Sequence, residues 1–239
     1  MKNQDKHSLQ NIRFYDEEAE KYDQLRYSSI AGKRVDNFHK SILDKFLIGS
    51  DELLELGCGT GRLLANFDSS KKLRGIDFSK GMLEIAKRRL SDRSNVDLRQ
   101  GDVRELPFEN ETFDAVYSIL VLNLISELDK VFQEVKRVLR PDGLFIFNIP
   151  NLASIYFLGG LYVNLRGKTV TSNNAGSRSS HWFRPKEWKE LLKKHRFELV
   201  SVLGQPPLLR SGYNSNPIDA SGFGLYFSKS IYIVAKNVS

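Results

Sequence analysis

The spacing of apolar positions changes at about residue 50. Over residues 12–47 apolar side chains recur every three or four positions, which predicts helices, and Gly and Ser within 28–32 predict a break between two of them. From residue 51 short apolar runs alternate with helical patterns of about ten residues. This alternation is typical of βαβ units, which form a parallel sheet with helices on both faces.

Seven strands are predicted, of which the last two are separated by a loop rich in Gly, Pro, Ser and Asn rather than by a helix. The strands are Glu52–Leu56, Leu73–Ile76, Val96–Arg99, Phe113–Leu120, Leu144–Ile149, Phe197–Leu203 and Ser230–Lys236. Helices are expected over Arg62–Phe67, Lys80–Leu90 (capped by Ser79), Leu128–Leu139 (capping box Ser126 and Asp129) and Pro185–Lys194. We therefore expect an α/β fold with a doubly wound, mostly parallel seven-stranded sheet and one antiparallel edge strand.

Composition is that of a globular protein, with 41% apolar and 27% charged residues, which excludes a disordered or fibrous chain. Cys58 is the single cysteine, so intramolecular disulfides and multi-cysteine metal sites are excluded. The N-terminal residues lack the apolar stretch of a secretory signal, and the longest apolar run, Leu152–Val163, is too short to span a membrane. We expect one cytoplasmic domain over residues 1–239, without integral membrane association.

The net charge of +7 is concentrated in the C-terminal third. Residues 151–239 carry 12 basic and 4 acidic side chains, and no acidic residue occurs between Asp142 and Glu187. This pattern predicts either a face that meets an anionic partner or an ordinary solvated surface.

A glycine-rich turn is the sharpest chemical feature. Gly57, Gly59 and Gly61 follow the first predicted strand, where missing side chains let a ligand approach the backbone and helix amides can bind anions. Asp77 ends the second strand, 18 residues after Gly59, at a position suited to ribose hydroxyls. Asp102 and Val103 follow the third strand and could contact an amine and a ring nitrogen. Three strand ends thus direct polar groups toward one crevice.

Four stretches resemble the class I S-adenosylmethionine-dependent methyltransferases, in the small-molecule branch of the type 11 methyltransferases. They are LLELGCGTGRLL (53–64), GIDFSKGMLEIAKRR (75–89), GDVRELPFENETFDAVYSILVL (101–122) and EVKRVLRPDGLFIFNIPN (134–151). They follow the family's order and separations over about residues 15–150, so the set is far more specific than any single stretch.

The resemblance implies S-adenosyl-L-methionine as cofactor, S-adenosyl-L-homocysteine as product, and a Rossmann-like sheet. It implies a helical N-terminal lid over 1–50, a cofactor-binding half over 51–150, and substrate-side insertions with the last two strands over 151–239. The implied cofactor-binding residues are Glu55 near the methionine amino group, Gly57, Gly59 and Gly61 beneath the cofactor, Asp77 at the ribose, Met82, Asp102 and Val103 at the adenine, with Phe78 and Ser118 beside them.

Two tyrosines belong to a segment, FYDEEAEKYD, that resembles the lid of small-molecule members. Tyr22 could reach the cofactor carboxylate, and Tyr15 is a candidate substrate contact. The alternative is that both rings lie on the core face of a helix.

The implied reaction is an SN2 transfer from a sulfonium, for which the protein must align the reactants and exclude water. A base is needed only for a nucleophile that is protonated at the working pH. His181 is the candidate, a packing or surface histidine being the alternative. Asn123 is a candidate substrate contact at a position where many small-molecule members carry histidine.

Several chemistries are excluded. Cys58 lies inside the glycine turn and cannot attack a pyrimidine, and the fourth strand lacks the Pro-Pro-aromatic run of methylases that act on nucleic-acid amines. No Cys and His set indicates a metal site.

The acceptor is the open question. An apolar run over 152–163, followed by Arg166, Lys168, Arg178 and Arg184, predicts an anionic or amphiphilic small molecule; a core helix or a dimer contact is the alternative. An RNA-directed methyltransferase, which would bind RNA with a steep salt dependence, and a non-catalytic cofactor-binding module are the other hypotheses. Both a monomer and a homodimer are compatible with the sequence.

Overall fold

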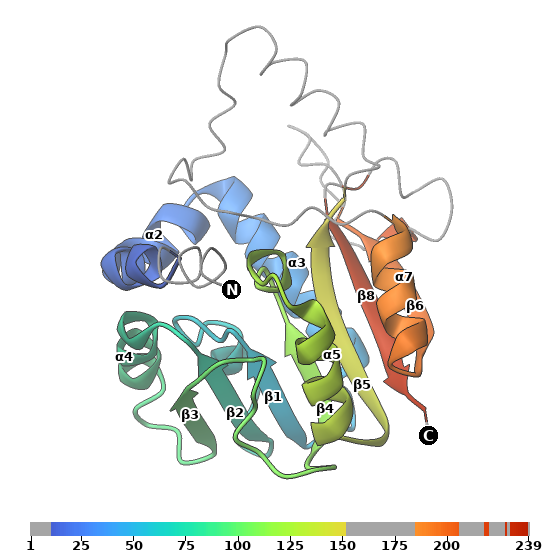
Figure 1. Cartoon of the computed structure of the whole chain (residues 1–239). Helices are drawn as coiled ribbons and strands as arrows, with labels where there is room; N and C mark the ends of the chain where they lie inside the picture. The colour runs from blue at the N-terminus through green and yellow to red at the C-terminus, as the bar shows by residue number, and fades with distance from the viewer. Residues whose placement is uncertain (1–10, 152–184, 206–217, 220–227, 229, 239) are drawn as a thin grey trace, which may run out of the picture.

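The structure is a computed structural model that describes residues 11–151, 185–205, 218–219, 228 and 230–238 (Figure 1). The strands are β1 (Glu52–Leu56), β2 (Lys72–Asp77), β3 (Val96–Gln100), β4 (Phe113–Ser118), β5 (Leu139–Pro150), β6 (Phe197–Gly204), β7 (Ile218–Asp219) and β8 (Ser230–Asn237). The helices are residues 11–18, η1 (Ala19–Lys21), α2 (Tyr22–Tyr27), α3 (Ile30–Phe46), η2 (Leu64–Asn66), α4 (Lys80–Arg89), η3 (Leu122–Leu124), α5 (Leu128–Val138) and α7 (Pro185–Lys194).

All strands belong to one sheet with the order β3-β2-β1-β4-β5-β8-β6-β7. The pairs from β3 to β5 are parallel, β8 runs antiparallel to both β5 and β6, and the two-residue β7 lies antiparallel to β6 at the edge. The predicted fold class is confirmed. Strand order reverses between β1 and β4, and ligands of doubly wound sheets bind at such a switch point.

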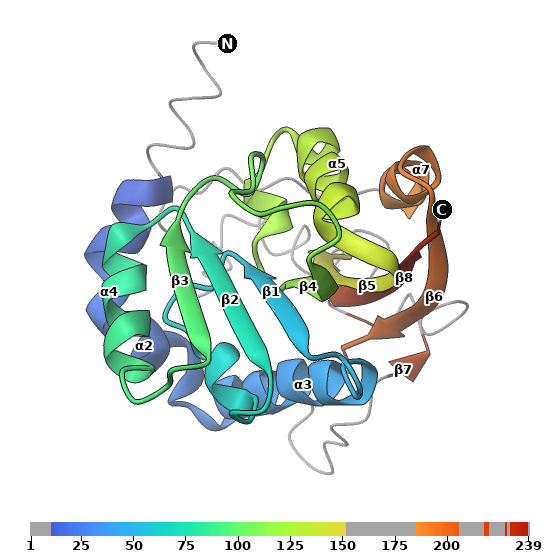
Figure 2. The same ribbon diagram turned by 90° about the horizontal axis from the view of Figure 1, so that it is seen from below.

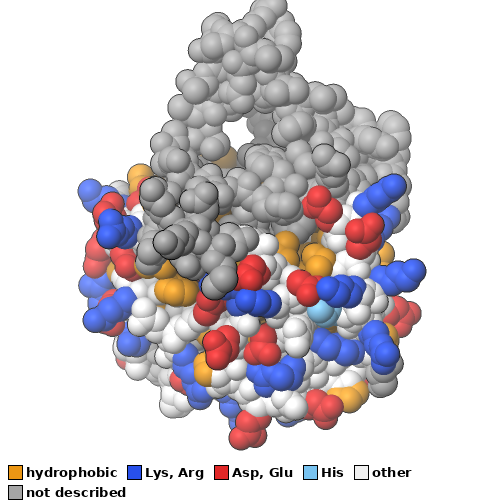
Figure 3. All heavy atoms as spheres, viewed as in Figure 1, with side chains coloured by type: hydrophobic (Ala, Val, Ile, Leu, Met, Phe, Trp, Pro, Cys, Tyr) orange, Lys and Arg blue, Asp and Glu red, His pale blue; other side chains and the backbone are white. Residues whose placement is uncertain are grey.

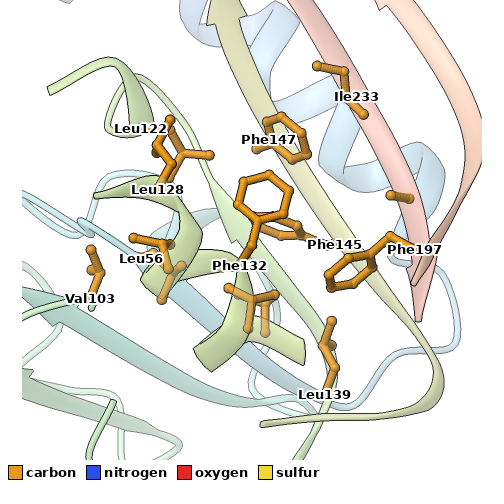
Figure 4. Packing of buried hydrophobic residues seen from close by; sticks show 14 of the residues in the cluster. Leu56, Val103, Leu122, Leu128, Phe132, Leu139, Phe145, Phe147, Phe197 and Ile233 are labelled. Atoms are coloured by element: carbon orange, nitrogen blue, oxygen red, sulfur yellow. The ribbon is translucent and has the colours of Figure 1, made fainter. Parts of the chain in front are cut away.

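Helices cover both faces of the sheet because the parallel strands are apolar on both sides. In Figure 2, α3 lies on one face, α5 and α7 lie on the other, and α4 lies beside β3. Phe132 of α5 packs edge-on against Phe145 and Phe147 of β5 and against Phe197 of β6 (Figure 4). Phe38 and Ile42 of α3 are fully buried on the opposite face.

Three local predictions differ from the structure. The predicted helix Arg62–Phe67 is a turn followed by the short 3-10 helix η2, since the chain must bury Leu63 and Phe67 and still reach β2 at Lys72. The capping box of α5 does not form: Glu127 occupies the N-cap without a side-chain hydrogen bond. Asp129 instead pairs with Lys194 and His195 near the end of α7, at 2.7 and 2.8 Å. Tertiary partners thus replace the local cap.

The third difference concerns Pro141-Asp142-Gly143, predicted as a turn before the fifth strand. This tripeptide lies within β5, which begins at Leu139. Asp142 has a positive φ of 64°, and the register against β4 shifts between Phe113 and Ala115. The turn-forming residues therefore produce a bulge inside a longer strand.

Within the described ranges, no helix is both long enough and apolar enough to cross a membrane. The apolar run Leu152–Val163 lies outside the described residues.

Candidate functional site

A pocket lies at the carboxyl ends of β1 to β4, next to the switch point. It is lined by residues of the N-terminal helices, the glycine turn, the ends of β2 and β3, and the segment after β4. These are Asn11, Ile12, Tyr15, Tyr22, Gly57, Gly59, Asp77, Phe78, Ser79, Met82, Gly101, Asp102, Val103, Arg104, Ile119, Leu120, Val121, Leu124, Ile125 and Ser126. Nine of the residues predicted from the sequence therefore meet around one cavity.

The glycine turn is fixed to the neighbouring strand by its backbone. The amides of Gly57 and Cys58 both donate to the carbonyl of Ile76, at 2.7 and 3.1 Å. Gly57, Gly59 and Gly61 have positive φ angles of 69°, 53° and 70°, a conformation that side chains disfavour. The three glycines are thus required by the shape of the turn.

The three glycines nevertheless differ in what surrounds them. A Cβ at Gly57 would overlap the side chain of Val121, and a Cβ at Gly61 would lie 2.8 Å from Leu90. A Cβ at Gly59 would have nothing within 4 Å, and Gly59 lines the pocket. Two glycines therefore permit internal packing, and the middle one leaves space for a ligand.

Asp77 holds the turn and also faces the pocket. Its two carboxylate oxygens accept from the amides of Gly59 (2.7 Å) and Ser79 (2.9 Å). Burial raises the pKa of Asp77, against the effect of these amides. A carboxylate has about four acceptor positions, so positions remain for a ligand's hydroxyl groups. Phe78, half-exposed, and Met82, buried in α4, add apolar walls beside it.

Asp102 is bound by a side chain that was not predicted from the sequence. The Arg104 guanidinium donates to both of its carboxylate oxygens, at 2.6 to 3.0 Å, and donates to Glu127 at 2.8 Å. Burial alone would raise the pKa of Asp102, but the bonds from Arg104 outweigh it and lower the pKa. Asp102 is therefore an ionised hydrogen-bond acceptor, and Arg104 occupies part of its acceptor capacity. It lies beside Val103 in the pocket wall.

The N-terminal helices are attached to the glycine turn and to α4. Asp16 accepts from the Ser79 hydroxyl at 2.5 Å and from the Gly81 amide at 2.9 Å, at the first turn of α4. Asp23 accepts from the hydroxyl of Thr60 at 3.0 Å. Acidic groups favour a helix N-terminus, so these contacts hold the helices over the pocket.

Tyr22 and Arg26 form the interior of this cover. The Arg26 guanidinium stacks 3.9 Å from the ring centroid of Tyr22, and its Nη2 donates to Glu18 at 2.7 Å. Burial raises the pKa of the Tyr22 hydroxyl. The Arg26 side chain is 10% exposed, and its buried Nη1 has no partner among the residues that the structure describes. A buried donor without a partner next to a pocket indicates a place for an acceptor from a ligand.

Some predicted site residues lie behind the pocket rather than in its wall. Glu55 is 3% exposed and accepts from the Tyr117 hydroxyl at 3.2 Å, which supports the turn from within the core. Gly61 packs against α4, and the fully buried Ser118 donates to the Leu56 carbonyl at 3.3 Å.

The structure describes only some of the residues predicted to contact the substrate. Asn123 lies half-buried in η3, whose Leu124 lines the pocket. His181, like the basic residues after the apolar run, lies outside the described residues. In the described part of the chain no cluster of three or more His, Cys, Asp and Glu could hold a metal ion.

The pocket wall formed after β4 was not predicted from the sequence. Ile119, Leu120, Val121, Leu124 and Ile125 all line the pocket, although only Asn123 was selected from this segment. Their signal was an apolar run directly after a strand end, which is equally typical of core residues.

Comparison with known proteins gives one family match and several similar proteins. Residues 54–147 match the family model described as a methyltransferase domain. An uncharacterized protein of Methanocaldococcus jannaschii is 28% identical, with 94% of this chain and 90% of that protein covered. A demethylmenaquinone methyltransferase of Symbiobacterium thermophilum is 30% identical, but the match spans only 55% of each protein.

Among solved structures, an S-adenosylmethionine-dependent methyltransferase of Thermotoga maritima, described as a possible histamine N-methyltransferase, has the same fold. The TM-score is 0.67 at 19% identity, over 92% of this chain and 95% of that one. The matched domain contains the glycine turn, Asp77 and Asp102, which meet at the pocket. Residues 54–147 therefore match a methyltransferase domain, and the fold is that of an S-adenosylmethionine-dependent methyltransferase of known structure.

Proposed function

We propose that this chain transfers the methyl group of S-adenosyl-L-methionine to a small-molecule acceptor. The observation that carries the proposal is that Gly59, Asp77 and Asp102 reach one pocket from three successive strand ends, beneath a helical cover. When bound, the cofactor supplies an activated methyl group on a sulfonium. The chain's own residues then need to bind, orient and exclude water.

The residues present fit this cofactor. Open space above Gly59 admits a ligand against the backbone, and Asp77 retains acceptor positions for two ribose hydroxyls. Met82 and Val103 offer an apolar surface to an adenine. Asp102 can accept a hydrogen bond at the edge of the adenine with the acceptor positions that Arg104 does not occupy. Glu55, Gly61 and Ser118 would act indirectly, by supporting the turn.

Arg26 extends this assignment to the amino-acid end of the cofactor. Its Nη1, which has no partner among the described residues, is buried beside Tyr22, which lines the pocket. A carboxylate is the acceptor that best satisfies a guanidinium, through a charge-assisted hydrogen bond. We assign Arg26, together with Tyr22, to the α-carboxylate of the cofactor.

The acceptor is proposed to be amphiphilic or anionic. The segment after β4 and Ile12 give the pocket an apolar wall, and the Symbiobacterium relative is named for a quinone-type substrate. Asn123, Tyr15 and His181 remain the proposed acceptor-side residues. We also propose one domain over residues 1–239, working in the cytoplasm, where a single cysteine stays reduced.

No observation in the described residues favours RNA as the acceptor. On the face shown in Figure 3, basic and acidic side chains of the described residues are interspersed rather than segregated. Phosphate recognition would favour a continuous basic surface.

The test is calorimetric titration with S-adenosyl-L-methionine and S-adenosyl-L-homocysteine, followed by transfer of a labelled methyl group to a panel of acceptors. Quinol precursors, other amphiphilic acids and low-salt RNA form the panel. We expect micromolar cofactor binding and labelling of a small molecule. The absence of binding by the intact chain would refute the cofactor assignment, and labelling of RNA alone would refute the acceptor class.

Replacing Arg26 tests the carboxylate assignment. Arg26→Gln should weaken S-adenosyl-L-homocysteine binding about tenfold, the value of one charge-assisted hydrogen bond, and leave 5′-methylthioadenosine binding unchanged because that ligand lacks the amino acid. Arg140→Gln is the control, since Arg140 pairs with Asp114 at the opposite edge of the sheet. Equal losses for both ligands would contradict the assignment.

A further inference from the structure

The chain turns sharply after β4, through a residue in an uncommon conformation. Leu120 has a φ of 65°, in the left-handed region that a branched side chain rarely adopts. Its side chain is 39% exposed and lines the pocket. Such a conformation persists only where surrounding structure enforces it, and it is common at functional sites.

One side chain from the neighbouring strand holds this turn. The amide oxygen of Asn148, on β5, accepts from the Leu120 backbone N–H at 2.6 Å. Asn148 is 2% exposed and lies opposite Tyr232 of β8 in the sheet, so it is fixed on both sides. An apolar residue at position 148 would leave the Leu120 amide without this partner. Unpaired backbone donors away from water are costly, so the turn would rearrange.

The turn determines where the next residue lies. Val121 follows Leu120, and its side chain occupies the space that a Cβ at Gly57 would need. Ile119, Leu120 and Val121 all line the pocket. A chain of contacts therefore runs from Asn148, through the turn 119–121, to the first glycine of the glycine turn.

We infer that Asn148 is a positioning residue for the cofactor pocket: it holds the turn 119–121 in its left-handed form and thereby holds Val121 against Gly57. The inference rests on the proposed function of this pocket, because its readout is cofactor affinity. Asn148 does not line the pocket, so its effect is transmitted through Leu120 and Val121.

The test compares variants by calorimetric titration with S-adenosyl-L-homocysteine, with thermal unfolding measured in parallel. Asn148→Leu removes the acceptor, and we expect affinity to fall about tenfold or more. Asn148→Asp keeps an acceptor oxygen in place and should remain within about threefold of the unmodified chain. Asn148→Ser, whose hydroxyl is too short to reach, replaces the leucine variant if that variant does not fold.

A rescue separates positioning from general support. Glycine adopts a φ of 65° without help. Asn148→Leu should therefore lower cofactor affinity much less in a chain that already carries Leu120→Gly than in the unmodified chain. Asn151→Leu is the matched control: Asn151 is also buried, but its amide donates to the Ser228 carbonyl at 2.8 Å. We expect that variant to lose thermal stability and keep its affinity.

Two results would overturn the inference. One is lower thermal stability of Asn148→Leu with unchanged affinity, which would assign Asn148 a purely structural role. The other is a failure of Leu120→Gly to restore binding. Failure of the unmodified chain to bind the cofactor product would instead refute the proposed function, so the two failures are distinguishable.

Discussion

Glu52 and Glu55 lie three residues apart on β1, at opposite ends of the strand and in opposite electrostatic surroundings. Glu52 accepts from Lys72 at 2.8 Å and from Arg74 at 2.6 Å; burial alone would raise its pKa, but these bonds lower it. No cation of the described residues pairs with Glu55: burial raises its pKa well above the usual value, against a hydrogen bond from Tyr117.

The same contrast extends across the two edges of the sheet. At the amino edge, Asp114 accepts from the amides of Asp51 and Glu52, each at 2.9 Å, and pairs with Arg140. At the carboxyl edge, Asp77 is partly buried with a raised pKa, and Leu120 is left-handed. One edge satisfies its charges and stabilises the fold. The other holds groups in costly states that a ligand can relieve, which is typical of a binding site.

The largest expected effect is at Asp77. Asp77→Ala should weaken S-adenosyl-L-homocysteine binding about tenfold or more, because it removes a charge-assisted bond to the ligand and the bonds that hold Gly59 and Ser79. Calorimetric titration measures it.

Asp114→Ala is the matched change at the opposite edge. It removes bonds to two backbone amides and to Arg140, so it should lower the unfolding temperature and leave cofactor affinity unchanged. Equal affinity losses in both variants would remove the contrast between the two edges.

A smaller effect is expected at Gly59. Gly59→Ala introduces a Cβ at a φ of 53° and into ligand space, so affinity should fall about fivefold and stability by about 1 kcal/mol. Calorimetric titration measures the affinity, and chemical denaturation measures the stability.

Gly49→Ala supplies the control for backbone strain. Gly49 has a φ of 82°, and a Cβ added there would, as at Gly59, meet nothing within 4 Å, but Gly49 lies outside the pocket. It should lose similar stability and no affinity. A fall in affinity for both variants would mean that strain, rather than contact with the ligand, explains the Gly59 result.

The smallest expected effect is on the free energy of unfolding when either glutamate is replaced, and its sign differs between the two. Glu55 has a raised folded-state pKa, so stability falls as pH rises from the ordinary glutamate pKa through the folded one. Glu55→Gln removes this loss and should raise the free energy of unfolding at pH 7. The gain should shrink as the pH is lowered toward the ordinary value.

Glu52 has a lowered folded-state pKa, so its contribution is present above the ordinary glutamate pKa and disappears as pH falls through the folded one. Glu52→Gln should therefore destabilise the protein at neutral pH, and the loss should vanish in acid. Denaturation curves across pH measure both variants. The same sign for the two substitutions would contradict the electrostatic contrast.

Much of the site could be predicted because parallel strands end at a common edge. Gly59, Asp77 and Asp102 were identified from strand ends, and all three line the pocket. Arg104 was missed because its partner Glu127 is distant in sequence. Arg26 was missed although its partner Tyr22 is only four residues away, because the burial of its guanidinium depends on how the N-terminal helices pack.

Periodicity and backbone requirements are local, so the alternating strands and helices, the glycine turn and the acids at the strand ends follow from the order of residues alone. Three other features follow only from the packed fold: Asp129 pairs with α7 instead of capping α5, β8 lies between β5 and β6, and Asn148 supports Leu120. They depend on which segments meet across the sheet, and a buried polar group takes the partner that packing brings to it.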